Sequence, residues 1–515
     1  MLGGTCETAR RTANSPDLRQ AFRPFSEISG TERHTMTGLS ILLQSVLAIV
    51  LVSLALFSLQ LGTLAFLRWL LPSRQPRAPG LPEEALPRVL VQLPVCDEGA
   101  LAVRVAAAAA RLDWPRDRLE VQVLDDGPRE KHEALAASIA RVTPDGVNVA
   151  VLHRGERAGF KAGNLAFGLK HSDAPFVAVF DADFVPPSDF LKRMVPALME
   201  DCGLAFVQAR WGHANRYRNW LTRAQGFLLD SHFAVEQEAR FRAGLPISFN
   251  GTAGVWSRAA IDHGGGWTGD TLTEDLDLSI RCALRGWRGA MISDLEVPGE
   301  LPETAAAWRA QQARWTKGHA QVARKIIPEI WTSNFPLWKK AAVTLQICQF
   351  SFYTLAFASA VISLTLMAMG VVYLKTVAGL GLIVTAIGLL ASVSYLYMGQ
   401  VMLGREYAPF FLRSLILAIV FPSGLILANT RATFEAFSNV KSVFQRTPKA
   451  GAAHIGSWRG RPELFVGVLL PVFALTEQAW SAPFFAFAAA GLLSIGAMGW
   501  TGAAPSPARD ITPGE

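Results

Sequence analysis

The chain has 515 residues, half of them hydrophobic and only 18% charged, with a formal net charge of +7. An average soluble chain carries about 25% charged residues, so part of this chain avoids water. This composition excludes fibrous, collagen-like and disordered proteins. No block of lysine and arginine is interleaved with aromatic residues. We therefore expect no nucleic-acid partner, and anionic lipid and a phosphorylated substrate instead.

The shortage of charge is local. Residues 80–335 have the charge balance of an ordinary soluble domain. Asp, Glu, Lys and Arg are all absent from five other stretches, 40–67, 341–374, 376–404, 414–430 and 478–507. These stretches mark the membrane-embedded part and predict an integral membrane protein, which in a bacterium would lie in the inner membrane.

The N-terminal region predicts one membrane crossing. Residues 1–36 form a polar tail without the pattern of a cleavable signal peptide, and Met36 is an alternative start. Residues 40–67 would make a helix of roughly 42 Å, whereas the hydrocarbon core is about 30 Å thick. We therefore expect one tilted transmembrane helix over 40–71, followed by a proline-rich linker into the domain 80–335.

The C-terminal half predicts further membrane segments. Residues 339–436 are expected to hold interfacial and transmembrane helices with two full spans, since Pro422 and Gly424 interrupt the stretch 410–436. The loop 437–462 is basic and contains no acid, which places it in the cytosol, where we also expect the soluble domain 80–335. An even number of crossings must therefore lie between them. Two last segments are expected, a transmembrane hairpin at 463–500 and a tail at 501–515.

Short apolar runs alternate with helical stretches from residue 88 onward. We expect strands at 89–95, 121–126, 147–152 and 176–183, with helices between them. This alternation predicts an α/β fold with a parallel sheet covered by helices on both faces. Ligands of such a sheet bind beyond the carboxyl ends of its strands.

Acidic residues stand at two of these strand ends. Asp181 and Asp183 follow the run FVAVF and predict a hard-oxygen site for Mg²⁺ or Mn²⁺. A solvated turn is the alternative for this pair. Asp125 and Asp126 end the run VQVL, where carboxylates can accept hydrogen bonds from a nucleotide, although Asp126 could instead cap the next helix.

Three later motifs add groups suited to a sugar nucleotide. Lys161 lies in the glycine-rich segment 159–164, where its charge can offset a diphosphate. The motif Thr273-Glu274-Asp275 opens a helical stretch, so it either caps that helix or presents a general base. Helical spacing puts Gln311, Arg314 and Trp315 on one face of a helix. These side chains either bind phosphate and stack on a sugar ring or pack at the membrane interface.

The ordered motifs resemble the membrane-embedded family-2 glycosyltransferases, in particular their cellulose-synthase-like and glucomannan mannosyltransferase branch. The motifs are PVCDE (94–98), VLDDG (123–127), KAG (161–163), DAD (181–183), VQARW (207–211), FNGTAG (249–254), TED (273–275), ELP (300–302) and QQARW (311–315). This resemblance implies a GT-A, Rossmann-like nucleotide-sugar domain with flanking transmembrane and interfacial helices. It also implies inverting transfer of a hexose from a UDP- or GDP-sugar.

The resemblance also implies a role for each motif residue. Asp275 would be the general base, and Asp181 and Asp183 would hold Mg²⁺ or Mn²⁺. The donor would be bound by Asp125 or Asp126, Lys161, Gln311 and Arg314. The acceptor would be bound by Trp315, Asn250, Gly251, Thr252 and Glu274.

Three functions compete at this point. The first is a hexosyltransferase that extends a β-linked polysaccharide from UDP-glucose or GDP-mannose, with an accessory export subunit as a further partner. The second is an enzyme that glycosylates a membrane lipid of the diacylglycerol or ceramide type. The third is a membrane scaffold without activity, which the complete set of Asp181, Asp183, Asp275 and Arg314 argues against.

Overall fold

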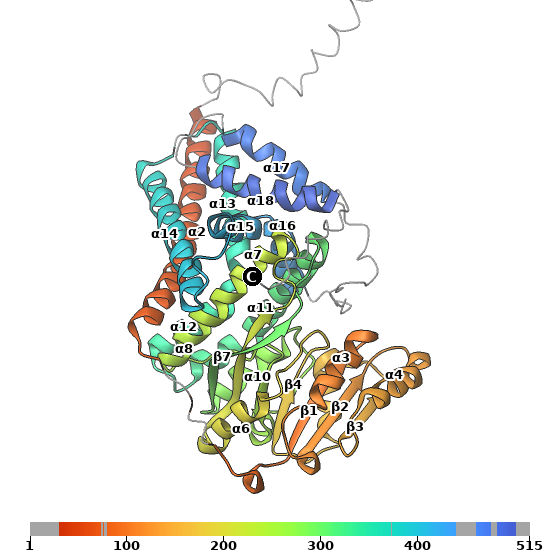
Figure 1. Cartoon of the computed structure of the whole chain (residues 1–515). Coiled ribbons are helices and arrows are strands. Elements are labelled where there is room, and N and C mark those ends of the chain that lie inside the picture. The colour runs from red at the N-terminus through yellow and green to blue at the C-terminus, as the bar shows by residue number, and fades with distance from the viewer. Residues whose placement is uncertain are drawn as a thin grey trace, which may run out of the picture.

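The computed structural model describes residues 30–73, 76, 80–371, 373–438, 460–474 and 482–500. Figure 1 shows a sheet-containing domain at one end of the molecule and a group of long helices at the other. Helix α11 (Ala305–Thr332) lies between the two parts and packs against helices of both. The predicted linker, the basic loop and the C-terminal tail lie partly or wholly outside the described residues, as does most of the N-terminal tail.

The sheet has seven strands in the order β3-β2-β1-β4-β6-β5-β7. The four strands that the alternating pattern predicts are β1 (Val89–Val95), β2 (Leu119–Asp125), β3 (Asn148–His153) and β4 (Phe176–Val179). They are parallel, as expected. The others are β5 (Leu204–His213), β6 (Gly254–Ser257) and β7 (Arg288–Gly299). Strand β6 runs antiparallel to β4 and β5, so the sheet is mixed rather than wholly parallel.

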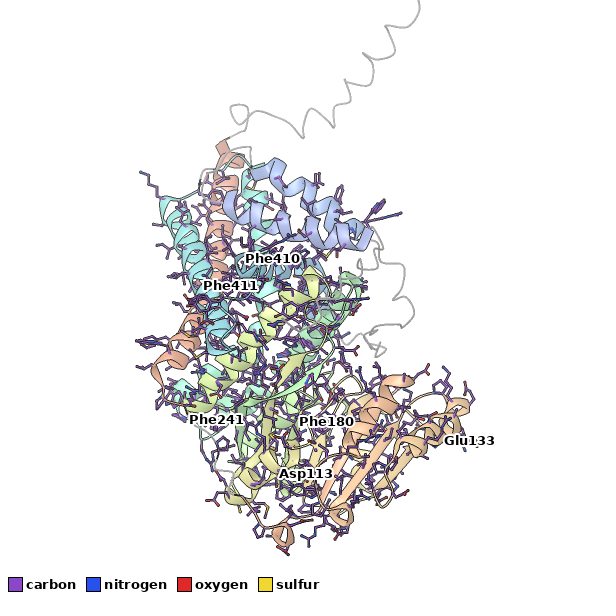
Figure 2. All side chains as sticks on the ribbon, viewed as in Figure 1. Asp113, Glu133, Phe180, Phe241, Phe410 and Phe411 are labelled. Carbon is purple, nitrogen blue, oxygen red and sulfur yellow. The ribbon has the colours of Figure 1, made fainter. Side chains whose placement is uncertain are left out.

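Helices cover both faces of the sheet. One core lies under three helices, α3 (Ala100–Ala109), α4 (Arg129–Val142) and α6 (Phe190–Glu200). In this core the buried Phe180, labelled in Figure 2, packs edge-on against Phe190, and the ring centres are 4.8 Å apart. The opposite core lies under α5 (Phe160–Leu169), α9 (Arg258–His263) and α10 (Glu274–Leu284). Burying both faces explains why the strands are nearly continuous apolar runs.

Short elements complete the sheet domain. They are η3 (Glu83–Ala85), η4 (Arg116–Arg118), α7 (Trp220–Ser231), the π-helical η5 (His232–Gln237) and α8 (Glu238–Arg242). The segment from α7 to α8 is a continuous helix with a π-helical turn in the middle, and it begins with a capping box, since the side chains of Asn219 and Thr222 each bond the other's backbone N–H. Its first helix, α7, packs against α15 (Phe411–Ser423), so it joins the sheet domain to the helical part.

Three described helical segments are long and apolar enough to cross a membrane, Thr37–Leu70, Leu337–Ala368 and Lys375–Met402. They comprise most of α2 (Gly30–Leu70), then α12 (Leu337–Ile347), η6 (Cys348–Phe350) and α13 (Ser351–Ala368), and finally α14 (Lys375–Met402). Helices α13 and α14 both pack on α2 (Figure 1), and the three share a core of buried apolar residues. Their outer sides remain apolar, with Ile49 68% and Leu390 69% exposed. Such surfaces suit lipid, because they would be unfavourable in water.

The helices that follow are shorter. Helices α15 and α16 (Ile426–Phe437) meet at a bend of 44°, close to the predicted interruption at Pro422 and Gly424. Phe410 and Phe411, labelled in Figure 2, mark the start of α15. The last two helices are α17 (Arg461–Ala474) and α18 (Ala482–Trp500), which pack on each other. Neither of them is among the described helices that are long and apolar enough to cross a membrane, so the transmembrane hairpin stays a prediction.

Candidate active site

The predicted donor-side carboxylates lie at one edge of the sheet. Asp125 is the last residue of β2, in register with Val95 at the end of β1 and His153 at the end of β3. Asp181 lies two residues after β4, and its backbone N–H donates to Thr252 Oγ1 at 2.9 Å. Parallel strands end at the same edge, so these motifs are brought together despite their separation in sequence.

A cavity of about 940 Å³ connects this edge to the long helices. The predicted site residues that line it are Asp126, Lys161, Asp181, Asp183, Asn250, Gly251, Glu274, Asp275, Gln311, Arg314 and Trp315. Two predicted residues are not among the lining residues, namely Asp125 and Thr252. Thr252 is fully buried and instead fixes the backbone of Asp181 through its hydroxyl.

Lys161 connects three of the motifs. Its ammonium lies 2.6 Å from Asp181 Oδ1 and 3.8 Å from Glu274 Oε1, and it donates to the carbonyl of Gly251 at 2.8 Å. Burial by itself lowers the pKa of Lys161. The nearby carboxylates of Asp181, Glu274 and Asp275 outweigh burial and raise this pKa above its ordinary value. The ammonium is therefore a stable positive charge in an acidic pocket.

Helix α10 presents Glu274 and Asp275 to the cavity. Thr273 precedes the helix but makes no capping bond with its side chain, so the alternative of a simple helix cap is not what this motif does. Burial raises the pKa of Asp275, although Lys161 and backbone N–H groups oppose the rise. Burial raises the pKa of Glu274 to about 7, with Asp275 adding to the effect. A carboxylate with a raised pKa is a stronger base than an ordinary one.

Gly251 is required by the space beside Asp275. Its φ of +80° is a backbone conformation that residues with a side chain rarely adopt. A Cβ at this position would lie 3.0 Å from Asp275 Oδ2 and 3.4 Å from Lys161 Nζ. The glycine therefore lets the backbone approach both charged groups closely.

Helix α11 supplies the last predicted group. Gln311, Arg314 and Trp315 lie on consecutive turns and all face the cavity. Burial lowers the pKa of Arg314, whereas the carboxylates of Glu274 and Asp181, and more weakly of Asp275 and Asp183, raise it. The guanidinium is therefore within electrostatic range of these four carboxylates of the cavity. A cation there suits a diphosphate leaving group.

Gly318 sets the distance between α11 and the start of α10. A Cβ on Gly318 would lie 2.5 Å from Cγ2 and 2.8 Å from Oγ1 of Thr273. We therefore expect Gly318→Ala to destabilise the fold by about 1–3 kcal/mol through overpacking, measured as a lower thermal unfolding midpoint. Gly379→Ala is the matched control, since Gly379 is also helical but has no neighbour within 4 Å. Equal midpoints for both variants would contradict this packing argument.

A polar network that the sequence analysis missed lies beside Asn250. Asn250 Nδ2 donates to His232 Nε2 at 2.9 Å, and His232 Nδ1 lies 3.0 Å from Glu236 Oε2. Gln237 Nε2 donates to Asn250 Oδ1 at 2.6 Å. His232 and Glu236 also line the cavity. The four-residue spacing of His232 and Glu236 on a helical stretch was the signal in the sequence that could have predicted this pair. The π-helical turn that directs both side chains toward the cavity depends on the tertiary structure.

Asp125, the last residue of β2, and Asp126, the residue after it, have different partners. Arg154 binds Asp126 with both ends of its guanidinium, at 2.6 Å and 2.7 Å, and also donates to backbone carbonyls of Ala158 and Phe160. Asp125 accepts from the backbone N–H of Gly127 at 2.8 Å. Helix α4 begins after Pro128 without a side-chain cap, so the alternative of Asp126 as a helix cap is wrong.

The sequence of the chain is similar to that of known glycosyltransferases. Residues 176–420 match the family model described as Glycosyl transferase family group 2. Glucomannan 4-beta-mannosyltransferase 1 of Oryza sativa subsp. japonica is 41% identical over 285 residues, covering 53% of this chain and 54% of that protein. Glucomannan 4-beta-mannosyltransferase 2 of Arabidopsis thaliana is 44% identical over 263 residues, covering 50% of this chain and 49% of that protein. These matches confirm the resemblance to family-2 glycosyltransferases and to their glucomannan mannosyltransferase branch.

A solved structure supports the fold class. The mannosyltransferase PcManGT from Pyrobaculum calidifontis, in complex with GDP-Man and Mn²⁺, aligns with a TM-score of 0.53 at 20% identity. The alignment covers 78% of this chain and 100% of that one. The predicted GT-A class is thereby confirmed. The chain spans about half the length of the curated relatives it matches.

Proposed function

We propose that the protein is an inverting, processive hexosyltransferase that extends a β-linked polysaccharide from a nucleoside diphosphate sugar. Mannose is the proposed sugar and GDP-mannose the proposed donor, because the curated relatives are named glucomannan 4-beta-mannosyltransferases. UDP-glucose is the competing donor. The observation that carries the proposal is the single cavity that joins the acidic site to helices α2, α13 and α14.

The membrane end of this cavity has a mixed lining, in which polar and aromatic side chains interrupt an apolar wall that includes Leu47, Leu51 and Val384. Hydroxyl and amide side chains line it beside the long helices, and they include Ser58, Gln349, Ser359, Ser363, Thr385 and Ser392. Aromatic rings of Trp308, Phe352 and Tyr353 lie among them. Sugars present hydroxyl groups at their edges and C–H surfaces at their faces, so mixed hydroxyl and aromatic walls suit a sliding polysaccharide.

The proposed chemistry is direct displacement at the donor's anomeric carbon. The ionised Asp275 takes the proton of the acceptor hydroxyl as that oxygen attacks, and the diphosphate leaves from the opposite face. Lys161 and Arg314 stabilise the negative charge that develops on the diphosphate. Attack opposite to departure inverts the anomeric carbon and gives a β-linkage from an α-linked donor. Trp315 and the network around Asn250 position the acceptor sugar.

The residues present fit a divalent cation beside this site. Asp181 and Asp183 offer hard carboxylate oxygens to the same cavity, the donor set that Mg²⁺ and Mn²⁺ prefer. Such an ion, held by Asp183 and Asp181, would supply Lewis-acid stabilisation of the leaving diphosphate. Lys161, now paired with Asp181, would then share the diphosphate charge.

The proposed topology puts the catalytic domain in the cytosol. The proposed membrane spans before residue 403 are helix α2 and the segments Leu337–Ala368 and Lys375–Met402. The bent pair α15–α16 is proposed to lie in the membrane interface. This arrangement gives two crossings between the domain and the loop 437–462. The hairpin of α17 and α18 would re-enter the membrane after that loop. Both nucleotide sugar and metal are available on the cytosolic side.

The test uses purified full-length protein in lipid nanodiscs with radiolabelled GDP-mannose or UDP-glucose. We expect label from GDP-mannose in ethanol-insoluble polymer that an endo-β-1,4-mannanase releases, with the Asp275→Asn variant as the blank. Label that enters polymer only from UDP-glucose would replace mannose by glucose. Label that partitions solely into organic solvent would establish the lipid-glycosylating alternative and overturn the polymer proposal.

A further inference from the structure

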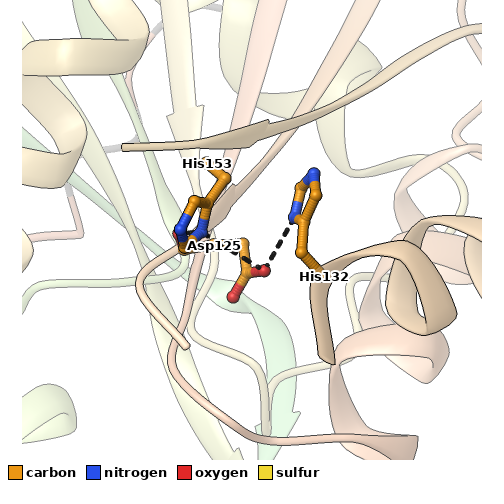
Figure 3. A group of neighbouring side chains, drawn as sticks. All are labelled: Asp125, His132 and His153. Carbon is orange, nitrogen blue, oxygen red and sulfur yellow. Dashed lines mark hydrogen bonds and ion pairs between the residues drawn. The ribbon is translucent and has the colours of Figure 1, made fainter. Parts of the chain in front are cut away.

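The edge of the sheet carries a second group of potential metal ligands, separate from Asp181 and Asp183. It consists of Asp125, His132 and His153, and each residue offers one ligand atom within 4.8 Å of the other two. Figure 3 shows both imidazole rings turned toward the Asp125 carboxylate. In the part of the chain that the structure describes, no other group of three such side chains meets this distance.

The fold holds this group in place from three elements. Asp125 and His153 are direct register partners at the ends of β2 and β3. His132 lies in the first turns of α4, which follows β2 directly. The Asp125 side chain is 3% exposed, while those of His132 and His153 are 25% and 15% exposed. The group is therefore rigidly supported yet open to a small ion from solvent.

The distances suit a transition metal. His132 Nδ1 lies 2.9 Å and His153 Nδ1 lies 3.8 Å from the same oxygen, Oδ2 of Asp125. Ligand atoms about 2.0 Å from a tetrahedral zinc ion lie roughly 3.3 Å apart, between these two values. The second oxygen, Oδ1, accepts the backbone N–H of Gly127, which fixes the carboxylate. His153 Nδ1 also lies 3.0 Å from the Asp125 carbonyl, and a metal ion on this nitrogen would replace the proton that is shared with that carbonyl.

We propose that Asp125, His132 and His153 form a binding site for Zn²⁺ or a similar borderline transition metal. Two imidazoles and one carboxylate are the ligands of such ions, whereas Mg²⁺ prefers oxygen alone. Water or a phosphate oxygen completes the coordination. Because Asp125 is also a proposed nucleotide contact, Zn²⁺ bound here would raise the apparent KM for the donor. That consequence rests on the proposed function, whereas metal binding itself does not.

The experiment measures metal binding directly. Metal-stripped full-length protein is titrated with Co²⁺, and the visible absorption of nitrogen-ligated Co²⁺ is followed. Excess Mg²⁺ is present throughout, so that sites made only of oxygen ligands are already filled. We expect intense absorption that saturates at one equivalent of Co²⁺ per protein and disappears when Zn²⁺ displaces the Co²⁺. His132→Asn and His153→Asn should each weaken binding at least 10–100-fold, the usual loss for even an outer-shell partner.

Matched controls separate this site from others. His171→Asn and His263→Asn remove histidines that lie outside the group, and Asp181→Asn alters the oxygen site, so all three should keep the Co²⁺ signal. Thermal unfolding without metal should show that the two test variants remain folded. Absence of nitrogen-ligated Co²⁺ in the unsubstituted protein would overturn the proposal. An unchanged signal in both His132→Asn and His153→Asn would overturn it equally.

Discussion

Asp275→Asn is expected to reduce sugar transfer by about 10²–10⁴-fold or more, while nucleotide-sugar binding stays within a few-fold of the unsubstituted protein. The amide is almost the same size as the carboxylate and can still accept the backbone N–H of Leu276, which lies 2.8 Å from Asp275 Oδ1. It cannot accept the proton of the acceptor hydroxyl. Single-turnover transfer and donor binding by calorimetry measure the two quantities separately.

Asp262→Asn is the matched control for that variant. Asp262 undergoes the same chemical change on α9, where its carboxylate is 60% exposed and pairs only with Arg258 among the interactions described. The rate of sugar transfer by Asp262→Asn should equal that of the unsubstituted protein within error. Full transfer by Asp275→Asn would remove Asp275 from the role of base. Loss of donor binding in parallel with transfer would instead assign Asp275 a binding role.

Removal of divalent cations is expected to bring transfer down to background. Asp181 and Asp183 face the same cavity as Lys161 and Arg314, so without a cation the two carboxylates would repel the incoming diphosphate. Excess chelator should abolish product formation, and added Mg²⁺ or Mn²⁺ should restore it. Initial rates over a titration of each metal provide the measurement.

Asp183→Asn separates the cation from a general effect of chelation. This variant keeps the side-chain volume but halves the charge of the proposed ligand pair. We expect it to need a higher concentration of Mn²⁺ for half-maximal transfer, if transfer is detectable. Undiminished transfer by the unsubstituted protein in excess chelator would exclude the metal role of both aspartates.

The sheet shows where local pattern is sufficient. Strands β1, β2 and β4 are buried on both faces and β3 is partly buried at the sheet edge, so each reads as an apolar run, and their alternation with helices predicts parallel pairing. Strand β6 comprises only Gly254–Ser257, and nothing in four residues records its direction. Pairing with β4 on one side and β5 on the other makes it antiparallel. The mixed character of the sheet is therefore a tertiary property.

The alternatives at the motifs were also decided by contacts between distant segments. Asp126 is bound by Arg154, which the motif itself does not indicate. Thr273 makes no capping bond with its side chain, and Gly318 of α11 instead brings that helix against it. His232 reaches Asn250 because of a π-helical turn. Each outcome depends on a partner at least 18 residues away in the chain.

The sequence by itself determined the α/β class, the apolar stretches long enough to cross a membrane and the identity of the charged motifs, because these depend on local hydropathy, periodicity and residue chemistry. Only the tertiary structure decided which charges meet. Lys161, Glu274 and Arg314 come from three different helices, and their raised or lowered pKa values arise from shared burial and from their proximity to one another and to Asp181. The same holds for Asp125 and His153, which are separated in sequence but paired in register by the sheet. Distance and desolvation fix these properties, and neither is written in local sequence.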